Sequence, residues 1–257
     1  MVDTADSSLK LPIKNGELWC GDCLDLMRDI PSGSVDMILC DLPYGTTQNK
    51  WDSVIPFAPL WAEYWRIAKP NAAVVLTAQC PFDKALGASQ LQWLKYEWIW
   101  SKSKPTGHLN AKKQPMKAHE NILVFYREQC TYNPQDLVRK PVPTIRKGRD
   151  NGQNYGSSAK DAVQEFENYP LSLIECGSAS MTIHPTQKPV ALFEYLIKTY
   201  TDPGQLVLDN CIGSATTAIA CENTSRRWIG IERDLTYCMS AWDRVMKHQP
   251  SSLRTTM

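Results

Sequence analysis

The chain has 257 residues, of which 43% are hydrophobic and 21% are charged. This length allows one α/β domain with a sizeable core plus an insertion, and the composition is that of a soluble globular protein. The absence of a run of 18 apolar residues excludes a membrane-spanning helix. The polar first ten residues carry no apolar secretion signal, so we expect a cytoplasmic protein.

Charge is distributed unevenly, although the formal net charge is only +1. Residues 101–149 carry 11 Lys and Arg against 3 Asp and Glu, a net of +8, while the rest of the chain carries 17 against 24, a net of −7. A basic middle on an acidic body is typical of a surface that binds a polyanion. A solvated loop rich in lysine would give the same composition.

The nine cysteines are an odd number and are scattered along the chain, which favours a reducing compartment over a disulfide framework. Cys20 and Cys23 have the C-x-x-C spacing of a redox or zinc site. No second such pair and no paired histidines follow to complete a zinc site. We therefore expect a strand end followed by a turn, with two small buried thiols.

Short β-like runs alternate with helical runs, a pattern that predicts an α/β fold with a doubly wound, mostly parallel sheet. Between loose ends (the first ten and last eight residues), strands are expected at 18–20, 35–40, 73–77, 96–100, 121–126, 206–208 and 228–231. Helices are expected at 57–68, 81–94, 189–200, 214–221 and 235–247. A basic loop is expected at 101–118. Residues 128–183 have weak periodicity and are expected to be an insertion between two halves, 11–127 and 184–248, of one domain.

The first of three predicted strands with an acidic end leads into Asp41-Leu42-Pro43-Tyr44. Ligands of open α/β sheets bind at the carboxyl ends of strands. Pro43 lacks an N–H, which leaves neighbouring carbonyls free to accept hydrogen bonds. Asp41 and the Leu42 carbonyl would then accept the two protons of an amino group, while Tyr44 stacks on a planar ring. An ordinary Pro-Tyr turn is the alternative.

The other two acidic strand ends lie close together near the C-terminus. Asp209 leads through Gly213 into a helix with Ser214 as its expected N-cap, which makes a cradle for a polar ligand or, alternatively, a simple capped helix. Neither G-x-G-x-x-G nor a P-loop is present, which disfavours a nicotinamide dinucleotide and excludes a P-loop nucleotide site. Glu232 ends the next strand, where an acid commonly binds ribose hydroxyls.

Together these segments resemble the amino-methylating DNA methyltransferases in their permuted β-class order, over roughly residues 18–248. The D-P-P-Y loop of that family matches Asp41 to Tyr44, with Leu42 in place of the first proline. Its cofactor loop, D-P-F-x-G-S-G-T-T, matches residues 209–217, with three substitutions that include Cys211. Its H-P-T-Q-K-P segment is present unaltered at 184–189.

The resemblance implies a Rossmann-like fold that binds S-adenosylmethionine, with a target-recognition region at 128–183. It implies methyl transfer to N6 of a flipped adenine in double-stranded DNA, without a metal. It implies that the catalytic residues are Asp41, Leu42, Pro43 and Tyr44. It implies that the cofactor contacts come from Asp22, Asp41, Thr186, Lys188, Asp209, Cys211, Gly213, Ser214, Thr216 and Glu232. Lys188 would pair with the methionine carboxylate, or else be a solvated lysine at the start of a helix.

Several alternatives stay open beside N6-adenine methylation. The nearest is N4-cytosine methylation, although cytosine enzymes of the family more often begin the loop with Ser than with Asp. Protein-glutamine and RNA amino methyltransferases usually begin it with Asn and place it after the cofactor loop. A degenerate DNA-binding subunit is disfavoured by the intact Asp41, Pro43, Tyr44 and Asp209. A homodimer and a restriction endonuclease partner are compatible with the family, and the recognition sequence does not follow from these residues.

Overall fold

The computed structural model describes residues 9–46, 52–150, 157–158, 161–177 and 187–248. The chain forms two compact units, one of residues 1–133 and 172–257 and a smaller one of residues 134–171. In the described ranges no helix is long and apolar enough to cross a membrane.

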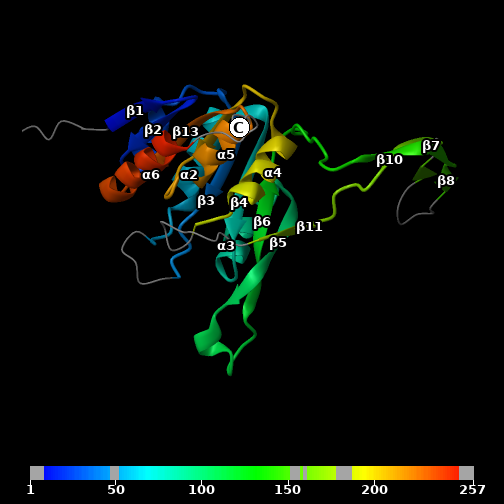
Figure 1. Cartoon of the computed structure of the whole chain (residues 1–257), viewed down its shortest axis with the longest axis horizontal. Coiled ribbons are helices and arrows are strands. Elements are labelled where there is room, and N and C mark those ends of the chain that lie inside the picture. Colours follow the sequence, from blue (N-terminus) through cyan, green and yellow to red (C-terminus); the bar gives the residue numbers. More distant parts are fainter. Residues whose placement is uncertain (1–8, 47–51, 151–156, 159–160, 178–186, 249–257) are drawn as a thin grey trace, which may run out of the picture. The chain divides into compact units, whose positions relative to one another are not determined.

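The larger unit is built on a nine-stranded sheet with the order β1-β2-β13-β12-β3-β4-β6-β5-β11 (Figure 1). All neighbours from β2 to β4 are parallel, as are β5 and β11, whereas β1 and β6 run antiparallel to the strands beside them. The strands are β1 (Leu9–Ile13), β2 (Gly16–Cys20), β3 (Val35–Asp41), β4 (Ala68–Ala78), β5 (Leu94–Thr106), β6 (Lys117–Phe125), β11 (Leu173–Cys176), β12 (Leu206–Asp209) and β13 (Arg227–Glu232). The predicted mostly parallel sheet is confirmed.

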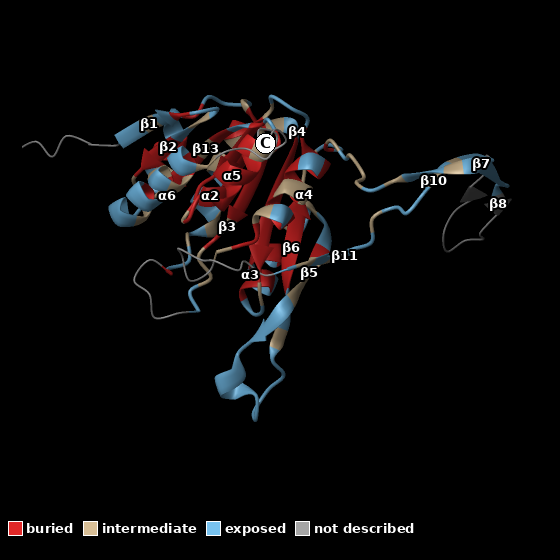
Figure 2. Ribbon diagram, viewed as in Figure 1, coloured by how far each residue is buried: buried red, intermediate tan, exposed pale blue. Residues whose placement is uncertain are grey.

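Helices cover both faces of this sheet, because successive side chains of each buried strand point to opposite sides. Leu39 and Val75 pack into one core, while their neighbours Ile38 and Val74 pack into the other. Figure 2 shows the central strands coloured as buried. The first core takes its helices from α4 (Val190–Tyr200), α5 (Thr216–Asn223) and α6 (Leu235–Lys247). The second takes them from α1 (Cys23–Leu26), α2 (Phe57–Ile67) and α3 (Phe82–Ser89), with the short 3-10 helix η1 (Met27–Asp29).

The segment 101–118 is the predicted loop only at residues 107–116. β5 continues to Thr106 and β6 begins at Lys117, so the two ends of the segment extend strands of the sheet, and residues 107–116 connect them; we call residues 101–118 the arm. Its tip carries the 3-10 helix η2 (His108–Asn110), and Figure 1 shows it projecting beyond the helices. The side chains of the extension of β5 to Thr106 show no apolar alternation, which is why the polar sequence concealed it.

Other expected boundaries also shift. β1 begins at Leu9, so the first ten residues are not all loose. Helix α5 begins at Thr216 with Ala215 as its N-cap, one residue after the expected cap at Ser214. β11 lies inside the expected insertion but pairs with β5 as the edge strand of the sheet. Residues 172–177 therefore belong to the larger unit.

The prediction of two free thiols is wrong for Cys20 and holds for Cys23. Cys20 in β2 forms a disulfide with Cys238 in α6, whereas Cys23 is free and buried. The two partners are 218 residues apart in sequence and meet because α6 packs on this end of the sheet. Local C-x-x-C spacing carries no information about such a contact.

The smaller unit is a set of short antiparallel pairs. β7 (Val138–Arg146) pairs with β10 (Ala162–Glu167), and β8 (Arg149–Asp150) pairs with β9 (Ser157–Ser158). Val142, Ile145 and Val163 are exposed on the first pair.

Candidate functional site

A cavity of about 580 Å³ lies at the carboxyl ends of β3, β12 and β13. Parallel strands bring their carboxyl ends to one edge of the sheet, so the three acidic strand ends meet there, as the sequence predicts. Thr186 lies outside the described residues. All other predicted site residues line the cavity: Asp22, Asp41, Leu42, Pro43, Tyr44, Lys188, Asp209, Cys211, Gly213, Ser214, Thr216 and Glu232.

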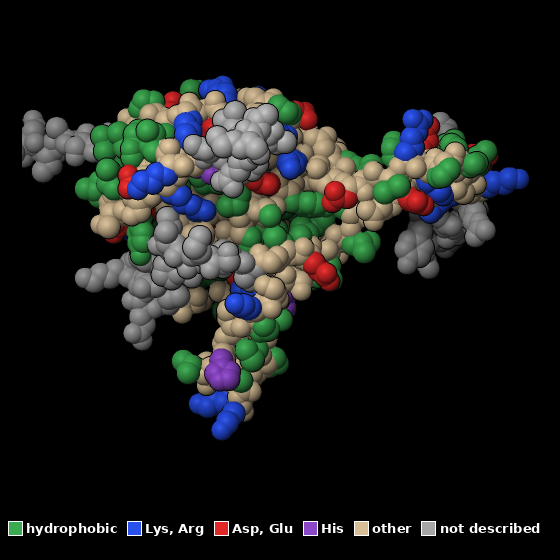
Figure 3. Space-filling model, viewed as in Figure 1, with side chains coloured by type: hydrophobic (Ala, Val, Ile, Leu, Met, Phe, Trp, Pro, Cys, Tyr) green, Lys and Arg blue, Asp and Glu red, His purple; other side chains and the backbone are tan. Residues whose placement is uncertain are grey.

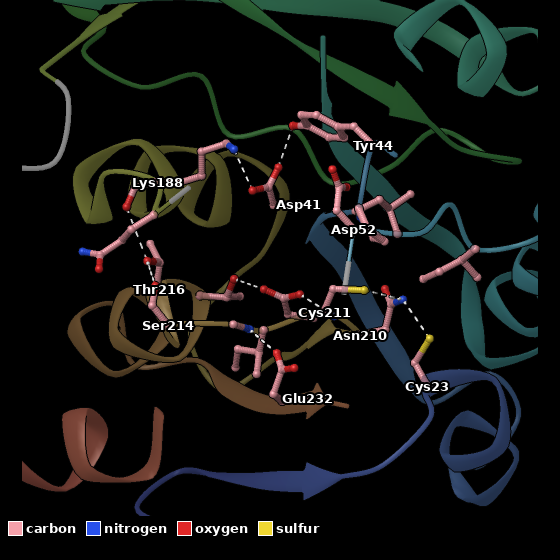
Figure 4. A pocket seen from close by; sticks show the side chains of 18 of the residues that line it. Cys23, Asp41, Tyr44, Asp52, Lys188, Asn210, Cys211, Ser214, Thr216 and Glu232 are labelled. Carbon is pink, nitrogen blue, oxygen red and sulfur yellow. Dashed lines mark hydrogen bonds and ion pairs between the residues drawn. The ribbon is translucent and has the colours of Figure 1, made fainter. Parts of the chain in front are cut away.

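Asp41 is held by three donors at the end of β3, two of which, Tyr44 and Lys188, are shown in Figure 4. Its Oδ1 accepts hydrogen bonds from the hydroxyls of Tyr44, at 2.6 Å, and Thr77. Its Oδ2 accepts from the Lys188 ammonium at 2.6 Å. A carboxylate offers about four lone-pair positions, so roughly one remains for an incoming donor. The carboxylate is thus oriented from several sides before any substrate arrives.

Lys188 is buried, which excludes the solvated lysine that the sequence left open. Its Nζ lies 2.6 Å from Asp41 Oδ2 and 3.2 Å from Glu120 Oε2, and Glu120 is paired in turn with Lys102. Burial alone would lower the pKa of the Lys188 ammonium, but the Asp41 and Glu120 carboxylates outweigh it and raise that pKa. Lys188 is therefore a charged partner of Asp41.

Tyr44 forms a stacked pair with Phe82, with 5.1 Å between the ring centroids and 28° between the planes. The Lys188 Nζ lies 5.7 Å from the centroid of the Tyr44 ring. Burial, followed by the nearby Asp41 charge, raises the pKa of the Tyr44 phenol, so the phenol stays protonated and donates to Asp41. The aromatic wall of the cavity is thus a supported ring rather than a lone tyrosine.

Glu232 organises the opposite side of the cavity. Its Oε2 accepts from the Gly213 N–H at 2.9 Å and its Oε1 from the Asp234 N–H at 2.9 Å. Burial raises the pKa of the Glu232 carboxyl above its ordinary value. Asp22, on the neighbouring strand end, accepts from the Leu24 N–H at 2.9 Å and so caps α1. Two carboxylates therefore face a cavity whose loops they also shape.

The Asp209 carboxylate accepts hydrogen bonds from residues that follow it closely in the chain. Its Oδ1 accepts from the Cys211 N–H at 3.1 Å and its Oδ2 from the Thr217 hydroxyl. Burial raises the pKa of Asp209 to about 7. These bonds fold the chain back after β12 and direct residues 211–214 towards the cavity. Arg244 closes the far side of the turn by donating to the Ser214 carbonyl at 2.5 Å.

The DNA methylase family matches residues 35–243, which is most of the chain. The chain belongs to this family. The type II methyltransferase M.HpaI of Haemophilus parainfluenzae is 25% identical over 247 residues, which cover 89% of this chain and 73% of that protein. A structure described as the M1.HpyAVI–SAM complex is 25% identical, with a TM-score of 0.62 and coverage of 89% of this chain and 99% of that one. The cytosine-N4-specific PvuII methyltransferase has a TM-score of 0.67 at 16% identity, with 95% and 91% covered, and bears on the fold alone.

Several residues of the site in this DNA methylase escaped the sequence analysis: Thr77, Phe82, Lys102, Glu120 and Arg244. Glu120 had a usable signal, because it is the only acidic residue in the basic stretch 101–127. A lone acid among cations near a buried strand is a candidate for a paired charge. Phe82 and Thr77 gave no comparable signal, because they look like ordinary helix-start and strand-end residues.

Proposed function

We propose that this DNA methyltransferase transfers a methyl group to N6 of a flipped adenine in double-stranded DNA. The observation that carries the proposal is the Asp41 carboxylate, fixed by three donors with about one acceptor position left. It lies beside the Leu42 backbone and the supported Tyr44 ring at one wall of the cavity. Asp as the first residue of the loop favours adenine over cytosine, as the family resemblance indicates.

The methyl donor is S-adenosylmethionine, which supplies an electrophilic methyl group on a sulfonium. A cavity of about 580 Å³ fits such a ligand, since small-molecule sites span roughly 300–1,000 Å³. Carboxylates suit hydroxyl and amino donors of a nucleoside, so we place the ribose at Glu232 and the adenine near Asp22. The remaining wall comes from the end of β12, the loop after it and the start of α5: Asp209, Cys211, Gly213, Ser214 and Thr216. Within the described residues no cluster of His, Cys, Asp and Glu could hold a metal.

Asp41 and the Leu42 carbonyl have the chemistry that an amino group needs in order to react. The nitrogen of such a group is a poor nucleophile because its lone pair is delocalised into the ring. Two acceptors on the amino protons localise that pair and stabilise the positive charge that develops on the nitrogen. Lys188, Thr77 and Tyr44 hold the Asp41 carboxylate in place beforehand, so little reorganisation is needed when the base arrives.

The arm supports DNA as the substrate. Lys102 and Lys104, at the base of the arm, line the cavity. Lys112 and Lys113, at the tip of the arm, are exposed. Figure 3 shows basic side chains gathered at that tip. A base in the cavity must be extruded from the duplex at a cost of a few kcal/mol, and phosphates flanking it would run along the arm. We assign target recognition to the smaller unit, residues 134–171, which lies within the insertion expected at 128–183 between the halves 11–127 and 184–248.

Single-molecule sequencing of DNA from cells that express the protein tests this function. We expect N6-methyladenine in one sequence context, and no modification from cells that express the Asp41→Ala variant. N4-methylcytosine in a fixed context would replace adenine by cytosine as the target. Unmodified DNA from cells with abundant folded protein would contradict the proposed transfer.

A further inference from the structure

Four charged side chains form a row that leads from the base of the arm to the site; Glu120 and Lys188 are buried, and Lys102 and Asp41 are partly buried. Lys102 pairs with Glu120, Glu120 with Lys188, and Lys188 with Asp41. Their side chains are only 9%, 7%, 6% and 21% exposed, in that order. The members come from β5, β6, the segment before α4 and β3, so distant parts of the chain supply charges of alternating sign.

Such a row is costly to build for stability alone. Each buried ion loses several kcal/mol of hydration, and apolar residues of similar volume often stabilise a fold as well as the pairs do. The alternation gives both interior members, Glu120 and Lys188, an opposite charge on each side. The row ends on the carboxylate to which the proposed function gives the central role. Stability therefore explains the row less well than a role in orienting the Asp41 carboxylate does.

We infer that Glu120 and Lys102 are positioning residues, which hold the Lys188 ammonium against Asp41 and so direct the free acceptor position of Asp41 towards the target amino group. This inference rests on the proposed function. Glu120 is the only second carboxylate within ion-pair distance of Lys188 in the described part of the chain. Without it, Lys188 would be held by Asp41 and faced by the Tyr44 ring alone.

Lys102 and Glu120 also connect the site to the arm. Ser101 and His119 are register partners on β5 and β6, so Lys102 and Glu120 lie where the arm leaves the sheet. The two strands that present cations to DNA therefore also carry the residues that position the catalytic carboxylate.

The row predicts opposite effects on Lys188 for changes at Glu120 and at Lys102. The groups that face Lys188 are Asp41 on β3, Tyr44 in the following loop and Glu120 on β6, with Lys102 on β5 behind Glu120. In Glu120→Gln a supporting charge is lost, so burial lowers the pKa of Lys188 and its ammonium is lost at lower pH. In Lys102→Met a repelling charge is lost, so the ammonium persists to higher pH.

The first experiment compares the pH dependence of kcat, measured as transfer of tritiated methyl groups to DNA. We expect the alkaline limb of the profile to move down by about one pH unit or more in Glu120→Gln, and to move up in Lys102→Met. Glu97→Gln, which changes an exposed glutamate on β5, is the matched control and should overlay the wild type. Movement of the Glu120→Gln and Lys102→Met profiles in the same direction, or an equal loss at every pH, would reduce the row to a structural role and overturn the inference.

The second experiment does not depend on activity. In protein labelled with ¹³C at lysine Cε, the Lys188 signal is assigned by its loss in Lys188→Met and followed by NMR as the pH rises. We expect it to titrate at lower pH in Glu120→Gln than in the wild type, and an unchanged titration would overturn the inference. If Glu120→Gln does not fold, the test is the titration of Lys188 in Lys102→Met, which we expect at higher pH than in the wild type. A shifted titration in a protein that methylates no DNA would instead refute the proposed function and leave the row intact.

Discussion

Charged side chains are paired and largely buried at the cavity edge but exposed at the tip of the arm, although β5 and β6 contribute to both regions. At the cavity, Lys188 and Asp41 are paired inside a network that holds their geometry. At the tip of the arm, Lys112 and Lys113 are exposed to solvent. Amino methylation needs a fixed acceptor, and burial makes its hydrogen bonds strong. Phosphate binding gains from released counterions, which requires cations that are accessible in water.

Asp41→Ala should give the largest effect and act on the chemistry alone. Loss of the oriented acceptor removes stabilisation of the developing charge, so we expect kcat to fall by roughly a thousandfold. Calorimetry should show nearly unchanged affinity for S-adenosylmethionine, because Glu232 and the loop after β12 are untouched. Activity close to that of the wild type would remove Asp41 from the reaction and abolish the contrast between the two regions.

A double change at the tip, Lys112→Gln with Lys113→Gln, should act on DNA binding alone. Two lost phosphate contacts would weaken binding by roughly 20-fold at 0.2 M salt and reduce the slope of log affinity against log salt by about 1.8. Fluorescence anisotropy over a range of KCl concentrations measures both. At saturating DNA, kcat should be retained. Lys84→Gln with Lys247→Gln changes two exposed lysines outside the arm and serves as the control. An unchanged slope would exclude the tip from phosphate contact.

The same contrast explains what the sequence could and could not predict. Asp41, Asp209 and Glu232 each end a buried strand, and parallel strands bring their carboxyl ends together, so a local pattern was enough to place all three at one cavity. The α6 boundaries, Leu235–Lys247, followed from the helical spacing of apolar residues in the same way.

What escaped prediction depends on contacts between distant segments. The pairing of Lys188 with Glu120 and the Cys20–Cys238 disulfide join strands and helices whose approach is set by the finished fold. The extension of β5 to Thr106 escaped for another reason, because its side chains show no apolar alternation to reveal a strand.

Glu232→Gln should have a moderate effect on the cofactor side of the cavity. A neutral amide accepts hydrogen bonds less strongly than a carboxylate, so we expect roughly tenfold weaker binding of S-adenosylmethionine at neutral pH. The raised pKa of Glu232 gives a sign to the pH dependence. The carboxylate form binds, so wild-type affinity should fall as acidification protonates Glu232, and calorimetry of Glu232→Gln should show a flatter profile. Parallel profiles for the two proteins would assign the ribose to another group.

Ala215→Gly should give the smallest effect, and of opposite sign, because the cavity edge also holds backbone strain. Ala215 has a φ of +62°, in the left-handed region that costs a residue with a Cβ roughly 1–2 kcal/mol. Glycine removes that cost but adds freedom to the unfolded chain, so we expect a net gain of about 0.5–1 kcal/mol in the free energy of unfolding by urea. Ala218→Gly, inside α5, should instead lose about 1 kcal/mol. A loss in both variants would show that the methyl group of Ala215 stabilises the turn more than its backbone conformation costs.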